Sequence, residues 1–153
     1  IGQCEKHDAG ISFYGVYYGQ AALPHAPESL SYIDNSVIRG LKVYNVETSS
    51  DIPVYDLSAA AGRDPYEMFL GGARSLITVK NPNTEKERRL VVFRDSFGSS
   101  IAPLLTAGYS EITLVDIRYI SPSALGKLID FTKADDALFL YSASVINNSE
   151  TIK

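Results

Sequence analysis

The sequence has no tryptophan and a single cysteine, Cys4, in 153 residues. One cysteine excludes an internal disulfide and a cysteine-based zinc cluster, and it leaves the cellular compartment open. No apolar run approaches the roughly 18 to 20 residues of a membrane-spanning helix. Ile1 opens the chain without an initiator methionine or a signal-like apolar segment, so we expect a fragment or a processed chain.

Positive charge is also scarce. Lys and Arg number 14 against 18 Asp and Glu, which gives a formal net charge of -4 at pH 7. No basic run stands out, so we do not expect nucleic acid as a partner. Apolar residues make up 45% of the chain and charged residues 21%, the composition of an ordinary folded protein rather than a disordered one.

The second half of the chain alternates predicted strands with predicted helices. Runs rich in β-branched and aromatic residues indicate buried strands at 89–94, 112–115 and 137–141. A short helix is predicted after the first of them. It begins near Ser99 or Ser100, because a proline such as the one at 103 is tolerated only in the first turn.

A second helix is predicted between the other two strands. Ser121 is a typical N-cap residue, and Pro122 suits the first helical position. An apolar stripe with helical spacing follows, formed by Leu125, Leu128, Ile129 and Thr132. Strands separated by helices of this length are joined by crossovers, so residues 89–142 predict a βαβαβ unit with a parallel sheet.

The length suits one compact α/β domain over residues 1–153, with a less regular N-terminal half. Strands are predicted at 41–46 and 75–79, and residues 10–19 form a looser, glycine-punctuated stretch. Residues 81–89, a turn followed by charged side chains, are interpreted as a solvated, hairpin-like connection.

A serine stands where the strand at 89–94 gives way to a helix. In an open parallel sheet, ligands gather at the carboxyl ends of the strands, where helix N-termini offer free N–H groups. Ser96 at this edge could attack an acyl carbonyl, with backbone donors stabilising the oxyanion. Gly98 would let a substrate approach the backbone. The competing interpretation is a structural turn in which Ser96 or Asp95 caps the helix.

Further side chains are expected near the same edge. Arg118 could hold a carboxylate or developing negative charge, or it could simply pair with Asp116. Gly71 and Gly72 could present N–H groups to the site or form a tight turn. Asp95 is interpreted as a loop anchor, because consecutive residues leaving a strand point in different directions.

The end of the last predicted strand and the aromatic residues near the N-terminus offer additional candidates. Tyr141 and Ser142 are expected to line the pocket. Phe13, Tyr14, Tyr17 and Tyr18 could stack on sugar rings or could pack internally.

Several separated blocks carry a family resemblance. In chain order they are Phe69-Leu70-Gly71-Gly72, residues 75–80, Arg94-Asp95-Ser96-Phe97, Tyr109-Ser110-Glu111-Ile112, residues 115–119 and Leu138-Phe139-Leu140-Tyr141. Together they resemble the C-terminal portion of DHHW-motif proteins, relatives of the bacterial SGNH-type hydrolases and alginate O-acetyltransferases. The resemblance is strongest from about residue 66 onward and fainter over 13–60.

The resemblance implies a flavodoxin-like, three-layer α/β fold with a mainly parallel sheet, no cofactor, no metal and Ser96 as nucleophile. Its partners would be an Asp-x-His pair in an Asp-His-His-Trp block N-terminal to the serine. That block is absent: His7 and His25 are the only histidines, and neither matches. A serine hydroxyl needs an adjacent base, so we expect a C-terminal fragment of a longer protein that holds the nucleophile half and is inactive alone.

Three classes of function follow. The first is an acyl-ester hydrolase or O-acyltransferase acting on a glycan or acylated small molecule at the bacterial cell surface. The second is a noncatalytic domain that binds a glycan or partner in the same cleft. The third, nucleotide binding, draws on the spacing of Asp116, but the Gly-x-Gly-x-x-Gly turn and the Walker lysine are both missing.

Overall fold

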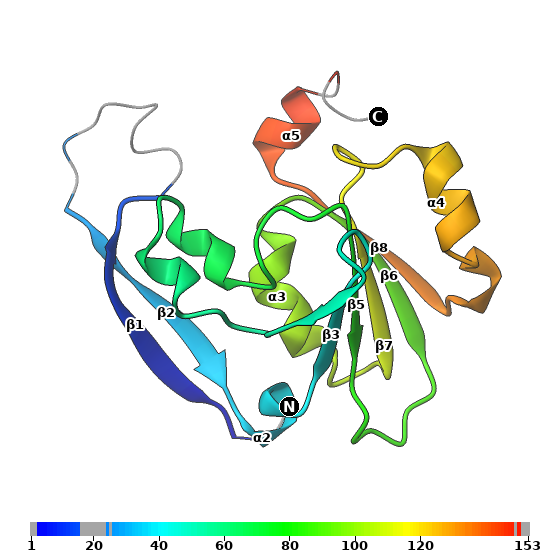
Figure 1. Ribbon diagram of the computed structural model, residues 1–153, viewed down its shortest axis with the longest axis horizontal. Helices are drawn as coiled ribbons and strands as arrows, with labels where there is room; N and C mark the ends of the chain where they lie inside the picture. The colour runs from blue at the N-terminus through cyan, green and yellow to red at the C-terminus, as the bar shows by residue number, and fades with distance from the viewer. Residues whose placement is uncertain (1–2, 16–23, 25, 149, 151–153) are drawn as a thin grey trace.

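The computed structural model describes residues 3–15, 24, 26–148 and 150. A six-stranded sheet, ordered β4-β3-β5-β7-β6-β8, lies beside a two-stranded sheet of β1 and β2 (Figure 1). The strands are β1 (Glu5–Phe13), β2 (Glu28–Asp34), β3 (Lys42–Asn45), β4 (Ser50–Ile52), β5 (Leu76–Lys80), β6 (Arg89–Arg94), β7 (Glu111–Val115) and β8 (Asp136–Leu140).

The predicted βαβαβ unit is confirmed. β6 pairs in parallel with β7 on one side and with β8 on the other. The crossover helices α3 (Gly98–Leu105) and α4 (Pro122–Leu128) cover opposite faces of this part of the sheet. Ala102 of α3 packs with Val92, whereas Leu125 of α4 packs with Val91, because neighbouring side chains of a strand point to opposite faces.

The prediction of a mainly parallel, flavodoxin-like sheet is wrong for the other half. β3 pairs antiparallel with both β4 and β5, and β5 pairs antiparallel with β7. The turn at 46–49 joins β3 directly to β4, and a connection of that length can only join antiparallel strands. The sheet is therefore mixed.

The connection from β5 to β6 also differs from its prediction. β7 lies between these two strands, so residues 81–88 do not close a hairpin. The N–H of Asn81 donates to the Ser110 carbonyl and the N–H of Ser110 donates to the Arg88 carbonyl, at 2.8 and 2.9 Å. The segment therefore crosses the start of β7.

Both predicted helices exist with different bounds. α3 contains Pro103 within the helix, beyond its first turn. Ser121 caps α4 as predicted, accepting from the Ala124 N–H, but the helix ends at Leu128. Asp130 then caps a separate 3-10 turn, η3 (Phe131–Lys133), which ends the predicted stripe early.

The first half is more regular than the sequence indicates. β1 and β2 form an antiparallel pair with an irregular register between Asp8 and Ser12, where Gly10 has a φ of +72°. Leu30 of β2 packs with Met68 and with η1 (Ala59–Ala61) and η2 (Pro65–Met68). The described ranges also contain the helices α2 (Ser36–Arg39) and α5 (Ala143–Asn147). Tyr17, Tyr18 and His25 lie outside the described residues.

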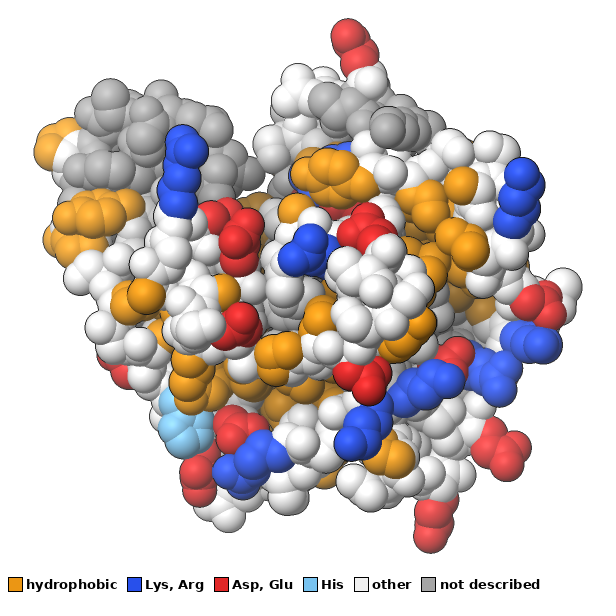
Figure 2. Space-filling view, viewed as in Figure 1, with side chains coloured by type: hydrophobic (Ala, Val, Ile, Leu, Met, Phe, Trp, Pro, Cys, Tyr) orange, Lys and Arg blue, Asp and Glu red, His pale blue; other side chains and the backbone are white. Residues whose placement is uncertain are grey.

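The surface mixes charges of both signs. Figure 2 shows Lys and Arg interspersed with Asp and Glu on the face in view. Over the part of the chain that the structure describes, no helix has the length and apolar character needed to cross a bilayer.

Candidate active site

Ser96 lies on the wall of a cavity of about 460 Å³. It is half-buried, in the turn between the carboxyl end of β6 and α3. Its hydroxyl makes no hydrogen bond to the described residues and is available for chemistry. The cavity is lined by Phe13, Gly15, Asp64, Tyr66, Asp95, Ser96, Phe97, Arg118, Ser142, Ser144, Val145 and Asn148.

The backbone donors around Ser96 are mostly occupied. The N–H of Phe97 donates to Asp95 Oδ1 at 3.0 Å, and the N–H of Gly98 donates to the Asp95 carbonyl at 3.1 Å. The N–H of Ser99 donates to the Ser96 carbonyl at 3.1 Å. The N–H of Ser96 itself bonds to none of the described residues, so it is the donor in this turn that can meet an oxyanion.

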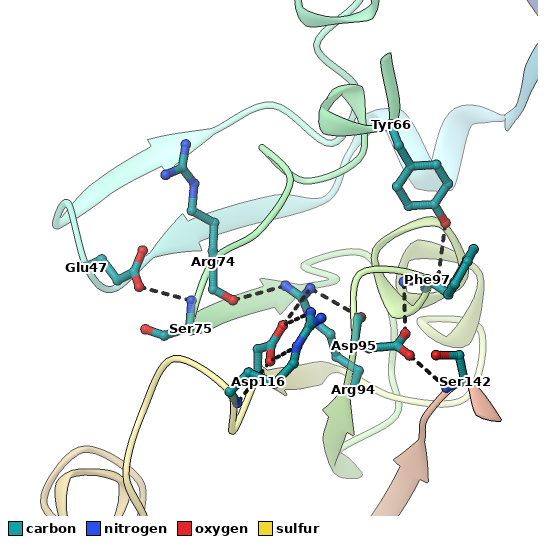
Figure 3. A network of polar contacts seen from close by, with 10 residues as sticks. Glu47, Tyr66, Arg74, Ser75, Arg94, Asp95, Phe97, Asp116 and Ser142 are labelled. Carbon is teal, nitrogen blue, oxygen red and sulfur yellow. Dashed lines mark hydrogen bonds and ion pairs between the residues drawn. The ribbon is translucent and has the colours of Figure 1, made fainter. Parts of the chain in front are cut away.

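Asp95 anchors the turn that carries Ser96. Its Oδ1 accepts from Phe97, and its Oδ2 accepts the N–H of Ser142 at 2.7 Å, as Figure 3 shows. The side chain is 2% exposed. Because Ser142 follows β8, one carboxylate ties the ends of two parallel strands together. This geometry is that of the loop anchor that the sequence predicts.

Arg118 reaches the cavity in a bidentate pair with Asp116. Its Nε lies 2.9 Å from Asp116 Oδ1 and its Nη2 lies 2.6 Å from Oδ2. These hydrogen bonds raise the pKa of the Arg118 guanidinium, so it is positively charged at any working pH. The sequence offered two interpretations of Arg118, a surface pair with Asp116 and a place at the candidate site. The structure agrees with both, since Arg118 pairs with Asp116 and lines the cavity.

A second arginine, Arg94, also forms an ion pair with Asp116. It is fully buried, with Nη1 3.7 Å from Asp116 Oδ2. Its Nη2 donates to the Arg74 carbonyl at 3.2 Å and its Nη1 to the Asp95 carbonyl at 3.3 Å. Burial lowers the pKa of Arg94, and Asp116 opposes that shift. The last residue of β6 therefore supports the Ser96 turn from inside.

Gly98 does not offer substrate an approach to the backbone, contrary to the sequence-based expectation. It is buried, and a Cβ atom there would lie 2.6 Å from Arg94 Cβ. Glycine is present because the Arg94 side chain occupies the space.

Gly71 and Gly72 form the tight turn that was the alternative interpretation. Their φ angles are +68° and +77°, and neither lines the cavity. A Cβ atom at Gly72 would lie 2.9 Å from Glu67 Cγ. Of the residues expected at the strand edge, Ser142 lines the cavity, whereas Tyr141 does not.

Tyr66 and the end of β1 form further walls of the cavity, and of these residues the sequence singled out Phe13 but not Tyr66. The Tyr66 hydroxyl lies 2.7 Å from Ser100 Oγ and donates to the Phe97 carbonyl at 3.2 Å. Burial raises the pKa of Tyr66. Phe13 and Gly15 continue from β1 into the same cavity. The glycine-punctuated aromatic stretch at residues 10–19 was the available sequence signal, and it does not predict which cavity Phe13 and Gly15 line.

Aromatic rings connect the turn at Phe97 with the two-stranded sheet. Neighbouring ring centroids lie 4.9 to 6.0 Å apart. In order, the rings are His7, Tyr32, Tyr55, Phe69, Tyr66 and Phe97.

His7 does not stand beside Ser96. It lies on β1, stacks on Tyr32 with the ring centroids 5.2 Å apart, and is not among the residues of the cavity wall. His25 lies outside the described residues. The described part of the chain therefore places no imidazole against the Ser96 hydroxyl, and it holds no cluster of three potential metal ligands.

The mixed α/β fold of this chain is shared with known structures. No protein-family profile matches the chain, and no curated protein sequence matches it. Solved structures do. A DHHW family protein from Eubacterium siraeum has the same fold, with a TM-score of 0.67 and 20% identity over 97% of this chain and 50% of that one.

PatB1 from Bacillus cereus, solved with a sulfonyl adduct, is also similar. Its TM-score is 0.69, with 21% identity over 94% of this chain and 48% of PatB1. A second PatB1 structure gives a TM-score of 0.63 and 20% identity. At these identities the likeness establishes the fold. It agrees with the DHHW resemblance of the sequence, and the chain spans about half the length of the structures it matches.

Proposed function

We propose that this chain is the nucleophile-bearing part of an SGNH-like acyl-ester hydrolase or O-acyltransferase. The observation that carries the proposal is the position of Ser96 on the cavity wall. Neither its hydroxyl nor its N–H bonds to a described residue, while Asp95, Arg94 and Gly98 hold the turn. The sulfonyl adduct of PatB1 supports this, because such an adduct forms when a nucleophile attacks sulfonyl sulfur.

The chemistry follows from the atoms present. Ser96 Oγ attacks the carbonyl carbon of an ester and loses its proton to a base, and the carbonyl oxygen becomes an oxyanion near the Ser96 N–H. The alcohol leaves with a proton, which gives an acyl-serine. Water then yields a free acid, whereas a sugar hydroxyl yields a new ester. Arg118 is placed to hold an anionic part of either reactant.

The base lies in another part of the protein in this proposal. We take the chain to be the C-terminal part of a longer protein whose preceding segment contains an Asp-x-His pair. The imidazole of that pair would accept the Ser96 proton, and the carboxylate would orient it. The family resemblance alone supports a glycan acceptor and a location at the bacterial cell surface.

Turnover of aryl acetates and acetylated sugars by the longer protein tests the proposal. We expect acyl-ester turnover that falls at least 1000-fold in Ser96→Ala, and mass spectrometry should place a sulfonyl label on Ser96. Ser99→Ala is the matched control, because that hydroxyl is buried and outside the cavity wall. Equal turnover with and without Ser96 would refute the assignment.

A noncatalytic binding domain is the second candidate. The position of His7 favours it, because this histidine stacks on Tyr32 and does not line the cavity beside Ser96. In that case the longer protein has no esterase activity, yet it binds glycan equally well before and after Ser96→Ala.

A further inference from the structure

Helix α3 has an apolar stripe that does not face the six-stranded sheet. Ala102 and Leu105 pack in the core of the sheet. Phe97, Ile101 and Leu104 follow the i, i+4, i+7 spacing of a second stripe on a different face of the helix. Phe97 is 44% exposed and Ile101 is 43% exposed. This second stripe can therefore line a binding site.

A cavity of about 200 Å³ lies against the second stripe, and we call it the α3 hollow. Its apolar walls come from α3, from β2 and from the segment that follows β4, and Ser100 adds a hydroxyl. The apolar lining residues are Ile33, Tyr55, Phe69, Ile101 and Leu104. Since an apolar cavity of roughly 150 Å³ can hold benzene, the α3 hollow has room for several methylene groups.

Tyr66 stands between the α3 hollow and the cavity that Ser96 lines. Its side chain is part of the wall of the Ser96 cavity. Its hydroxyl lies 2.7 Å from Ser100 Oγ, and its ring centroid lies 4.9 Å from that of Phe69. Because Ser100 and Phe69 both line the α3 hollow, one aromatic side chain separates the two spaces.

Tyr66 is held in place at both ends. Its hydroxyl donates to the Phe97 carbonyl at 3.2 Å, as Figure 3 shows, and the Ser100 hydroxyl donates to the same carbonyl at 3.1 Å. Its backbone N–H donates to Asp64 Oδ1 at 3.0 Å, where Asp64 caps η2. Moving the ring aside costs the hydrogen bonds of a half-buried hydroxyl, so a ligand meets a fixed wall.

The walls of the Ser96 cavity differ in character. Arg118 and Ser142 are polar, as a sugar or a leaving alcohol requires, whereas Tyr66 and Phe97 are aromatic, with ring centroids 6.0 Å apart. An acyl chain on Ser96 gains most by packing on the aromatic rings, because its methylene groups leave water there. The chain therefore extends toward Tyr66.

We propose that Tyr66 limits the length of the acyl group that Ser96 can carry. Its ring closes the Ser96 cavity toward the α3 hollow and leaves room for a short acyl chain. A small side chain at this position would join the two spaces and admit a longer chain along Ile101 and Leu104. The inference rests on the proposed function in taking Ser96 as the residue that accepts the acyl group.

Turnover of 4-nitrophenyl hexanoate and 4-nitrophenyl acetate by the longer protein tests this role. We expect Tyr66→Ala to raise the hexanoate-to-acetate ratio of kcat/KM at least 10-fold, because one methylene group in an apolar pocket is worth roughly 10- to 200-fold. Tyr66→Phe keeps the ring and should stay within about threefold of the unsubstituted ratio. A substitution that merely loosened the fold would slow both esters and leave the ratio unchanged, which would overturn the inference.

A double variant locates the extra room. Ile101→Trp, added to Tyr66→Ala, refills the α3 hollow from a position that is 43% exposed, where a larger side chain is tolerated. The hexanoate-to-acetate ratio should return to within about threefold of the unsubstituted value. A ratio that stays high would place the longer chain outside the α3 hollow and contradict the role of Tyr66 as its barrier.

Binding in the Ser96→Ala background requires no catalysis. Hexanoate should shift the methyl NMR signals of Ile101 and Leu104 when Tyr66→Ala is also present, and acetate should not. With Tyr66 intact, hexanoate should leave these signals unchanged, and equal responses with and without Tyr66 would overturn the inference. A shift confined to the Tyr66→Ala protein, combined with no turnover of any ester by the unsubstituted protein, would refute the proposed function while leaving Tyr66 as the barrier.

Discussion

Gly98 lies directly against the side chain of Arg94, so the first residue of α3 rests on the last residue of β6. Arg94 has little freedom to move aside, because its guanidinium is held by the carbonyls of Arg74 and Asp95 and faces Asp116. The turn that contains Ser96 runs from Arg94 to Gly98, so this contact brings its two ends together. Its shape therefore depends on the absence of a side chain at one position.

Gly98→Ala should destabilise the protein by about 1–3 kcal/mol, because the new methyl group overlaps Arg94 Cβ and Cγ. Urea denaturation measures the change. Gly126→Ala in α4 is the control, since its Cβ position meets nothing within 4 Å apart from its chain neighbours and the backbone of its own helix, and it should stabilise the helix by about 0.5–1 kcal/mol. Equal effects of the two substitutions would show that the contact is not rigid.

Asp95→Asn should cost about 1–3 kcal/mol of unfolding free energy. An amide has one acceptor oxygen, so either Phe97 or Ser142 loses the partner of its N–H group. Denaturation of this variant can be compared with Asp130→Asn, an exposed 3-10 cap where an asparagine still accepts. The anchor role would be wrong if the Asp95 variant were no less stable than the control.

Ser99→Ala should leave the stability unchanged or raise it by up to about 1 kcal/mol. The Ser99 hydroxyl is fully buried and has no hydrogen-bond partner among the residues that the structure describes, so its removal ends a desolvation penalty. Thermal unfolding of the variant gives the sign. A clear loss of stability would reveal a partner for this hydroxyl.

Tyr55 makes stability depend on pH in alkaline solution. Burial, first of all, raises the pKa of Tyr55 from its ordinary value of 10.0 to about 12, and its hydroxyl donates to the Ile33 carbonyl. Because the folded-state pKa is the higher one, this stabilisation is complete below pH 10 and is lost as the pH rises toward 12. Tyr55→Phe should flatten that part of a stability-versus-pH curve. An unchanged slope would assign the effect to other groups.

The parallel half of the sheet could be predicted because its signals are local. The strands at 89–94 and 112–115 are continuous apolar runs, and the helices between them force crossovers. The antiparallel pairing of β5 with β7 could not be predicted, because nothing in the sequence shows that β7 lies between β5 and β6. Short strands such as β4 carry too little pattern to be recognised.

The candidate site divides in the same way. Ser96 and Asp95 follow from the strand-turn-helix pattern, whereas Phe13 and Tyr66 reach the cavity only through tertiary packing. Gly98 shows a different limit. Its sequence context indicates open space beside the backbone for a substrate, but the Arg94 side chain occupies that space.

The wall contributed by β1 bears on how this protein can be shortened. A polypeptide trimmed to begin at residue 35 would retain Ser96 and its anchor Asp95, yet it would lose Phe13, Gly15 and the rings of His7 and Tyr32. Such a deletion removes part of the cavity wall around the Ser96 hydroxyl. Trimming designed around the serine motif alone would therefore keep Ser96 and lose part of the cavity that it lines.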